Sequence, residues 1–137
     1  MRTLYVLFQI RIHDKNFTVN NKQIGAIGEQ YASDYLHNKG YRILVQNYTS
    51  RWGELDIVAE LHDKIIFVEV KTRRDTRRGM PYEGVTRSKL NHLRRTIQYY
   101  ILSNKLEKRK HQLDVVGILL KPDNSVGELK HYENLEM

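Results

Sequence analysis

The stretch "KIIFVEVKTRR", Lys64 to Arg74, places four consecutive apolar residues before an alternating glutamate and lysine. The apolar run, Ile65 to Val68, is short and rich in β-branched and aromatic side chains, which predicts a strand that is buried on both faces. Because strand residues two apart share a face, Glu69 and Lys71 are expected to lie side by side where this strand emerges from the core.

The pattern along the chain predicts an α/β fold with the order α-β-β-β-α-β and a further strand at the end, a central mixed sheet flanked by helices. One helix is expected from an Asn20 or Asn21 cap to Gly40, and a second from a Thr86 cap. The strands are expected at residues 41–48, 53–60, 64–72, 112–120 and around 128–134. Residues 1–19 are expected to be an N-terminal extension, either an extra strand or disordered, and residues 20–137 to form one domain.

A tight turn at His62 and Asp63 sets the expected register of the second and third strands. Pairing about this turn places Asp56 opposite Glu69, with Cβ atoms about 4.5 to 5.5 Å apart, where like charges destabilise the pair. A divalent cation removes that conflict, since Mg²⁺ or Mn²⁺ is held by carboxylates together with waters and phosphate oxygens. We therefore interpret Asp56 and Glu69 as metal ligands, and Lys71 as the group that orients a water or offsets transition-state charge.

Glu29, on the first predicted helix, is a further candidate catalytic residue. It lies at the edge of a face of small residues, Gly25, Gly28 and Ala32, which lets another element approach closely, and it can reach the metal through water. An ordinary carboxylate on a helix surface is the alternative for Glu29. A glutamate and a lysine two positions apart are, taken alone, also more often a solvated pair than a catalytic one.

The chain is basic, with 23 Lys and Arg against 16 Asp and Glu and a net charge of +7, which favours a nucleic-acid partner. Basic and hydroxyl side chains follow the proposed site closely, and the predicted nucleic-acid contacts are Arg73, Arg74, Arg77, Arg78, Thr86 and Lys89. A solvated loop is the alternative for this charge run. No apolar run approaches the roughly 18 residues of a spanning helix, so no membrane partner is expected. The absence of cysteine suits a cytoplasmic protein.

A wider motif contains these residues. Asp56, twelve intervening residues and then Glu69-Val70-Lys71, preceded by Glu29 on a helix, resemble the PD-(D/E)XK nuclease superfamily, whose restriction-endonuclease-like core is αβββαβ. More narrowly, the chain is similar to the YraN-like family of small bacterial proteins in the segments "GEQYASDYLHNKGYRILVQNY", "RWGELDIVAE", "IIFVEVKTR" and "GMPYEGVTRSK". The likeness runs from about Gln23 to Val116 and departs from the superfamily motif at Leu55, where the motif has proline.

The resemblance implies a metal-dependent endonuclease that hydrolyses DNA phosphodiester bonds, with Mg²⁺ or Mn²⁺ as cofactor and structured or branched DNA as the expected substrate. Cutting of junctions would require a homodimer, because two symmetric incisions need two sites. The alternative is a non-catalytic nucleic-acid-binding module that retains the nuclease fold.

Overall fold

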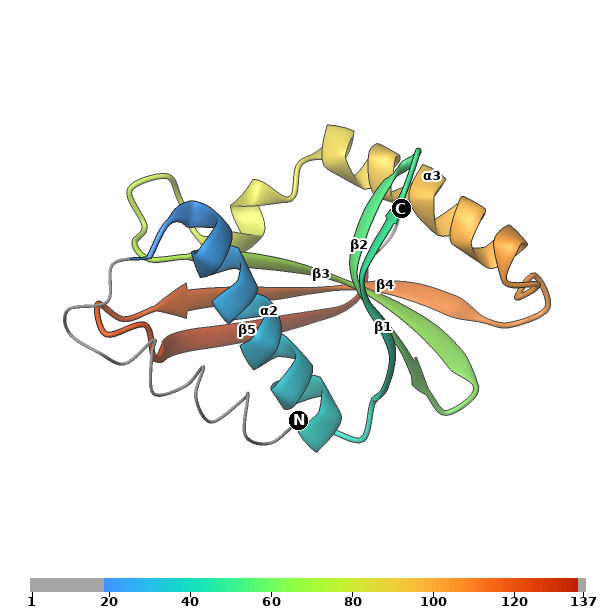
Figure 1. Ribbon diagram of the computed structural model, residues 1–137, viewed down its shortest axis with the longest axis horizontal. Coiled ribbons are helices and arrows are strands. Elements are labelled where there is room, and N and C mark those ends of the chain that lie inside the picture. Colours follow the sequence, from blue (N-terminus) through green and yellow to red (C-terminus); the bar gives the residue numbers. More distant parts are fainter. Residues whose placement is uncertain (1–18, 136–137) are drawn as a thin grey trace.

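The computed structural model describes residues 19–135, in which two α-helices flank a five-stranded mixed sheet (Figure 1). The helices are α2 (Asn21–Asn38), η1 (Pro81–Gly84, a 3₁₀ turn) and α3 (Arg87–Ser103). The strands are β1 (Arg42–Ser50), β2 (Gly53–Leu61), β3 (Lys64–Arg73), β4 (His111–Leu120) and β5 (Val126–Leu135). The predicted α-β-β-β-α-β order with a terminal strand is confirmed. The prediction for residues 1–19 falls, except for its last residue, outside the described residues.

Both long helices begin at the predicted side-chain caps. The Asn20 side chain accepts a hydrogen bond from the backbone N–H of Gln23 at 2.9 Å, and the Gln23 side chain accepts one from the N–H of Asn20 at 2.9 Å. Thr86 Oγ1 accepts a hydrogen bond from the N–H of Lys89 at 3.2 Å. These bonds satisfy N–H groups that have no partner within the helix, so each cap fixes where its helix starts.

The strands follow each other in the order β1-β2-β3-β4-β5, and only β3 and β4 run parallel. The parallel step requires a crossover, which η1 and α3 provide. The helices cover opposite faces: Ile24 and Ile27 of α2 pack in one core cluster, and Leu93 and Ile97 of α3 pack in the other. Neither helix in the described part of the chain combines the length and the apolar character that crossing a membrane requires.

The β2–β3 turn and register are also as predicted. His62 and Asp63 both have left-handed backbone angles, with φ of 47° and 62°, as a tight hairpin turn requires. The ladder then runs from the pair Leu61–Lys64 to the pair Ile57–Val68. Within β3, every residue from Ile65 to Val70 is buried, which confirms a strand covered on both faces.

One close contact holds α2 against the sheet. A Cβ atom added at Gly28 would lie 1.7 Å from Thr72 Oγ1 and 2.7 Å from Thr72 Cβ, so only glycine allows this approach. A Cβ atom added at Gly25 would meet nothing within 4 Å. The predicted close approach at the small-residue face therefore holds at Gly28 and not at Gly25.

This contrast predicts opposite effects of two glycine-to-alanine changes in one helix. Gly28→Ala should lower the free energy of unfolding by about 1–3 kcal/mol, because the β-branched Thr72 side chain cannot swing away. Gly25→Ala should raise it by about 0.5–1 kcal/mol, because alanine restricts the unfolded chain and favours the helix. Urea unfolding followed by circular dichroism measures both, and shifts of the same sign would contradict the packing described.

Candidate active site

The candidate site begins where β2 and β3 stop pairing through their backbones. Beyond the pair Ile57–Val68, the Asp56 carboxylate accepts the N–H of Val70 at 2.8 Å, so a side chain takes the place of the next backbone contact. This bond holds Asp56 beside Glu69, which is 5% exposed although it is charged. The predicted meeting of these two carboxylates is therefore what the strand register produces.

The pKa of Asp56 is raised well above its usual range. Burial is the largest cause, and the charge of Glu69 and a hydrogen bond shared with Glu69 add to it. The N–H of Val70 and the ammonium of Lys89 act in the opposite direction but are outweighed. Burial and the neighbouring carboxylate thus both favour the protonated form of Asp56 or the presence of a cation beside it.

Lys89 of α3 supplies one cation. Its Nζ lies 2.7 Å from Glu69 Oε1, while the Lys89 side chain remains 38% exposed. Burial opposes the charge on Lys89, but the hydrogen bond to Glu69 and the charges of Glu69 and Asp56 outweigh it and raise the Lys89 pKa. The sequence predicted Lys89 as a phosphate contact, whereas here it binds the buried glutamate.

A cleft of about 440 Å³ opens in front of these groups. Its walls come from β2, β3 and the first half of α3, and the residues that line it include Glu54, Asp56, Glu69, Thr86, Lys89 and His92. The β1–β2 hairpin closes one end, because Thr96 Oγ1 of α3 donates a hydrogen bond to the carbonyl of Trp52 at 3.0 Å. The carboxylates therefore lie in a recess that is large enough for a hydrated ion and a phosphate group.

Lys71 and Glu29, the other two predicted catalytic residues, do not line this cleft. The aliphatic stem of Lys71 runs against Gly84, where an added Cβ atom would come within 2.6 Å of Lys71 Cε. Glu29 lines a neighbouring hollow of about 220 Å³ with Gln46 and Asn47. The structure thus brings Asp56 and Glu69 together in the cleft, whereas neither Lys71 nor Glu29 is among the residues that line it.

Glu29 nevertheless interacts electrostatically with Asp56. Its pKa is raised to about 7, first by burial and then by the charge of Asp56, with a smaller contribution from Glu54. A hydrogen bond from Asn47 works in the opposite direction. Asn47 has a left-handed backbone angle, φ 54°, within β1, and asparagine tolerates this angle better than most residues. Sequence reasoning missed Asn47, because a polar residue in an edge strand gives no signal of its own.

The predicted arginine contacts form a folded loop between β3 and η1. Arg73 donates to the carbonyl of Arg78 at 2.7 Å, and Arg74 donates to the carbonyl of Pro122 at 3.3 Å. Arg77 pairs with Asp75 at 2.7 Å and is largely exposed. Contacts within and around the loop thus engage Arg73, Arg74 and Arg77, and Thr86, next to it, is engaged in capping α3.

The Asp56–Glu69 pair offers oxygen ligands from two residues. Among the described residues, three His, Asp or Glu ligand atoms within 4.8 Å of one another occur instead at Asp114, His131 and Glu133, on the other face of the sheet. A metal at Asp56 and Glu69 must therefore complete its coordination with water, a backbone carbonyl or substrate.

The fold and this cleft define an α/β protein with a carboxylate site at the divergence of two strands, and comparison with known proteins gives its family. Residues 28–118 match the model of the uncharacterised protein family UPF0102, and the chain belongs to this family. A UPF0102 protein of Alkaliphilus oremlandii is 48% identical over 116 residues, which cover 83% of this chain and 97% of that protein.

Two further relatives show the same coverage. A UPF0102 protein of Syntrophomonas wolfei is 45% identical over 105 residues, covering 77% of this chain and 91% of that protein. A UPF0102 protein of Dictyoglomus turgidum is 38% identical over 117 residues, covering 85% of this chain and 97% of that protein. The likeness therefore extends over the strands and helices that form the cleft.

The raised pKa of Glu29 predicts a specific pH dependence of stability. Between about pH 4.5 and pH 7 the folded protein holds a proton on Glu29 that the unfolded chain has released, so this contribution to stability is full below that window and is lost as the pH rises through it. Glu29→Gln keeps the neutral form at every pH. The stability of Glu29→Gln relative to wild type should therefore increase from pH 4.5 to pH 7.5.

Urea unfolding with a chelator present, at half-unit pH steps, measures this difference. The exposed Glu107→Gln is the matched control and should track wild type throughout. If the difference in stability between Glu29→Gln and wild type does not change with pH, the pKa of Glu29 is not raised by burial and by the charge of Asp56.

Proposed function

We propose that this protein is a Mg²⁺- or Mn²⁺-dependent nuclease that hydrolyses DNA phosphodiester bonds, with its active centre at Asp56 and Glu69. The observation that carries the proposal is the meeting of these carboxylates in an open cleft, one of them buried and the other with a raised pKa. Such an arrangement costs folding free energy unless a cation is present, and residues of this kind cluster at functional sites.

The donor set suits the proposed metal. Both ligands are carboxylates, and Mg²⁺ is usually held by one or two carboxylates plus waters and substrate phosphate oxygens. The N–H of Val70 fixes one Asp56 oxygen, so the carboxylate is already oriented. When bound, the ion would supply Lewis-acid stabilisation of the phosphoryl oxygens and activation of a water molecule.

The chain's own lysines complete the proposed centre. Lys89, whose ammonium is partly exposed at the wall of the cleft, would contact a substrate phosphate if Glu69 held a cation instead of the lysine. Lys71 lies two residues beyond Glu69 on β3 and holds a positive charge for the transition state. Glu29 adds a further carboxylate beside Asp56.

The resemblance of the Asp56 and Glu69-Val70-Lys71 spacing to the PD-(D/E)XK superfamily, and of the longer segments to YraN-like proteins, supports the same function. The α-β-β-β-α-β order agrees with the core of that superfamily. We place the activity in the cytoplasm, in keeping with a chain that has no cysteine.

The surface around the cleft suits DNA. The loop that carries Arg73, Arg77 and Arg78 leads into α3 at the cleft wall, and its contacts would give binding that weakens steeply with salt. Trp52, at the closed end of the cleft, is 38% exposed, with the Arg51 guanidinium 4.8 Å from its ring. An exposed aromatic ring with basic neighbours favours an unpaired base, as branched DNA provides, and symmetric cutting of a junction would need a homodimer.

A second candidate function is a nucleic-acid-binding module without catalysis. The observation in its favour is the ion pair between Lys89 and Glu69, which neutralises the buried glutamate without a metal. In this case Asp56 and Glu69 have a structural role, and the basic loop alone binds nucleic acid.

Cleavage assays with Mg²⁺ or Mn²⁺ on single-stranded, duplex, flap and four-way-junction DNA distinguish the two. For a nuclease, Lys71→Ala should lower the cleavage rate by about 100- to 1000-fold, because it removes one group that stabilises the transition state. Glu69→Gln should abolish metal-dependent cleavage. Both variants should keep salt-sensitive DNA binding.

The matched controls are Glu107→Gln and Lys108→Ala, in the loop between α3 and β4, at the opposite end of the sheet from the cleft. Both should cleave at the wild-type rate. DNA binding without cleavage by wild type under every metal condition would reject the nuclease in favour of the binding module, and cleavage that persists in Glu69→Gln would point to a contaminating nuclease.

A further inference from the structure

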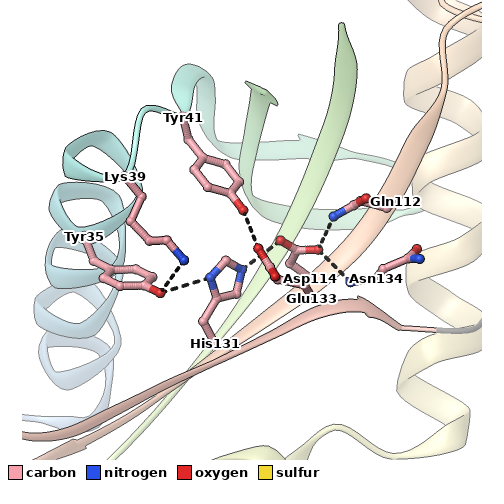
Figure 2. A network of polar contacts seen from close by, with 8 residues as sticks. All are labelled: Tyr35, Lys39, Tyr41, Gln112, Asp114, His131, Glu133 and Asn134. Carbon is pink, nitrogen blue, oxygen red and sulfur yellow. Dashed lines mark hydrogen bonds and ion pairs between the residues drawn. The ribbon is translucent and has the colours of Figure 1, made fainter. Parts of the chain in front are cut away.

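A second group of ligand-type side chains lies on the α2 face of the sheet, away from the cleft. Asp114 of β4 and His131 and Glu133 of β5 each offer one ligand atom, and these atoms lie within 4.8 Å of one another (Figure 2). Asp114 is fully buried and the His131 side chain is 4% exposed, whereas Glu133 reaches the surface. The nuclease proposal uses none of these residues.

The backbone brings the three together through an irregularity in the sheet. The β4–β5 ladder pairs Leu113 with Leu135 and Val115 with Tyr132, so one residue, Asp114, stands opposite two residues of β5. A bulge of this kind re-aims side chains and is frequent beside functional sites. Two residues apart on β5, His131 and Glu133 point to the same face, toward Asp114.

Each of the three side chains is held in place by a further group. Asp114 Oδ1 accepts hydrogen bonds from Gln112 Nε2 at 2.9 Å and from the N–H of Asn134 at 3.0 Å. His131 Nδ1 contacts the Tyr35 hydroxyl at 3.1 Å, and Glu133 Oε1 accepts a hydrogen bond from the Tyr41 hydroxyl at 3.1 Å. Metal ligands are typically oriented by such outer partners, which fix the imidazole ring and the carboxylates.

The cluster also gathers negative charge at one point. Asp114 and Glu133 bring two carboxylates to one point, and the contact between His131 Nε2 and Asp114 Oδ2, at 2.8 Å, accounts for only one of them. Lys39 ends on the Tyr35 hydroxyl at 3.2 Å, so it reaches the outer side of the network (Figure 2). A hydrogen-bonded His–Asp pair accounts for the burial of Asp114, and the Tyr41 hydroxyl holds the exposed Glu133 beside it, so two carboxylates and one imidazole meet at one point.

We propose that Asp114, His131 and Glu133 form a binding site for a divalent transition metal, Zn²⁺ foremost, with water in the fourth position. One imidazole nitrogen and two carboxylate oxygens are a donor set that Zn²⁺ accepts, whereas Mg²⁺ prefers oxygen ligands alone. Binding requires an unprotonated Nε2, so the ring proton then resides on Nδ1, facing Tyr35. The metal would link β4 to β5. Through the hydrogen bonds of Tyr35 and Tyr41, it would also link β5 to α2 and to the segment that follows α2.

Cobalt tests this site directly, because Co²⁺ takes the place of Zn²⁺ and its visible absorption reports nitrogen and oxygen ligands. The full chain carrying Asp56→Asn and Glu69→Gln serves as the parent, which removes the cleft carboxylates from the experiment. One equivalent of Co²⁺ should give visible bands, Zn²⁺ should abolish them, and millimolar Mg²⁺ should leave them unchanged. Zn²⁺ should also raise the melting temperature of the parent.

Glu133→Gln is the decisive variant, because Glu133 is exposed and glutamine can still accept the Tyr41 hydrogen bond. It should lower Co²⁺ affinity at least about 100-fold, since losing a ligand has a larger effect than losing an outer partner. His131→Gln should do the same, and Glu128→Gln, on the same strand, should bind like the parent. Absence of the bands in the parent, or bands that persist in Glu133→Gln and His131→Gln, would overturn the proposal.

Discussion

The hydrogen bond from the N–H of Val70 to the Asp56 carboxylate is the contact on which the candidate site depends. It forms where the β2–β3 ladder ends, and it replaces a backbone pairing with a side-chain pairing. Without it, Asp56 would be free to turn toward solvent and relieve its repulsion from Glu69. The fold thus holds two carboxylates together, and the pKa of Asp56 is raised by its burial and by the charge of Glu69.

The remaining parts of the site follow from this contact through the two helices. The Thr86 cap fixes the start of α3, so that Lys89, in its first turn, meets Glu69. On the other face, Gly28 brings α2 into contact with Thr72, and the next residue, Glu29, comes within the electrostatic reach of Asp56. The β2–β3 hairpin therefore supplies Asp56 and Glu69, and the positions of the two helices supply Lys89 and Glu29.

Much of this arrangement could be predicted from the sequence, because it rests on local signals. The caps at Asn20 and Thr86, the apolar run of β3 and the turn at His62 and Asp63 fix the elements and the register. The register brings β2 and β3 together up to the pair Ile57–Val68, next to Asp56 and Glu69. Each of these signals lies within a few residues of the structure that it determines, so no knowledge of the tertiary fold was needed.

The features that escaped prediction depend on contacts between residues far apart in the chain. The pairing of Lys89 with Glu69 depends on how α3 docks, and helical spacing does not report this. Asn47 hydrogen-bonds Glu29 across the contact between β1 and α2, at a point where β1 has a left-handed backbone angle. Asp114 meets His131 and Glu133 through a bulge between β4 and β5, and a bulge cannot be located from two alternating strand patterns.

Diffraction from crystals soaked in Mn²⁺, recorded at the manganese absorption edge, would show whether a divalent ion binds in the cleft. The account predicts an anomalous peak within coordination distance of Asp56 and Glu69, with Lys89 Nζ displaced from Glu69. Crystals that take up Mn²⁺ elsewhere, or not at all, while the pair between Lys89 and Glu69 stays intact, would contradict a metal-dependent centre in this cleft.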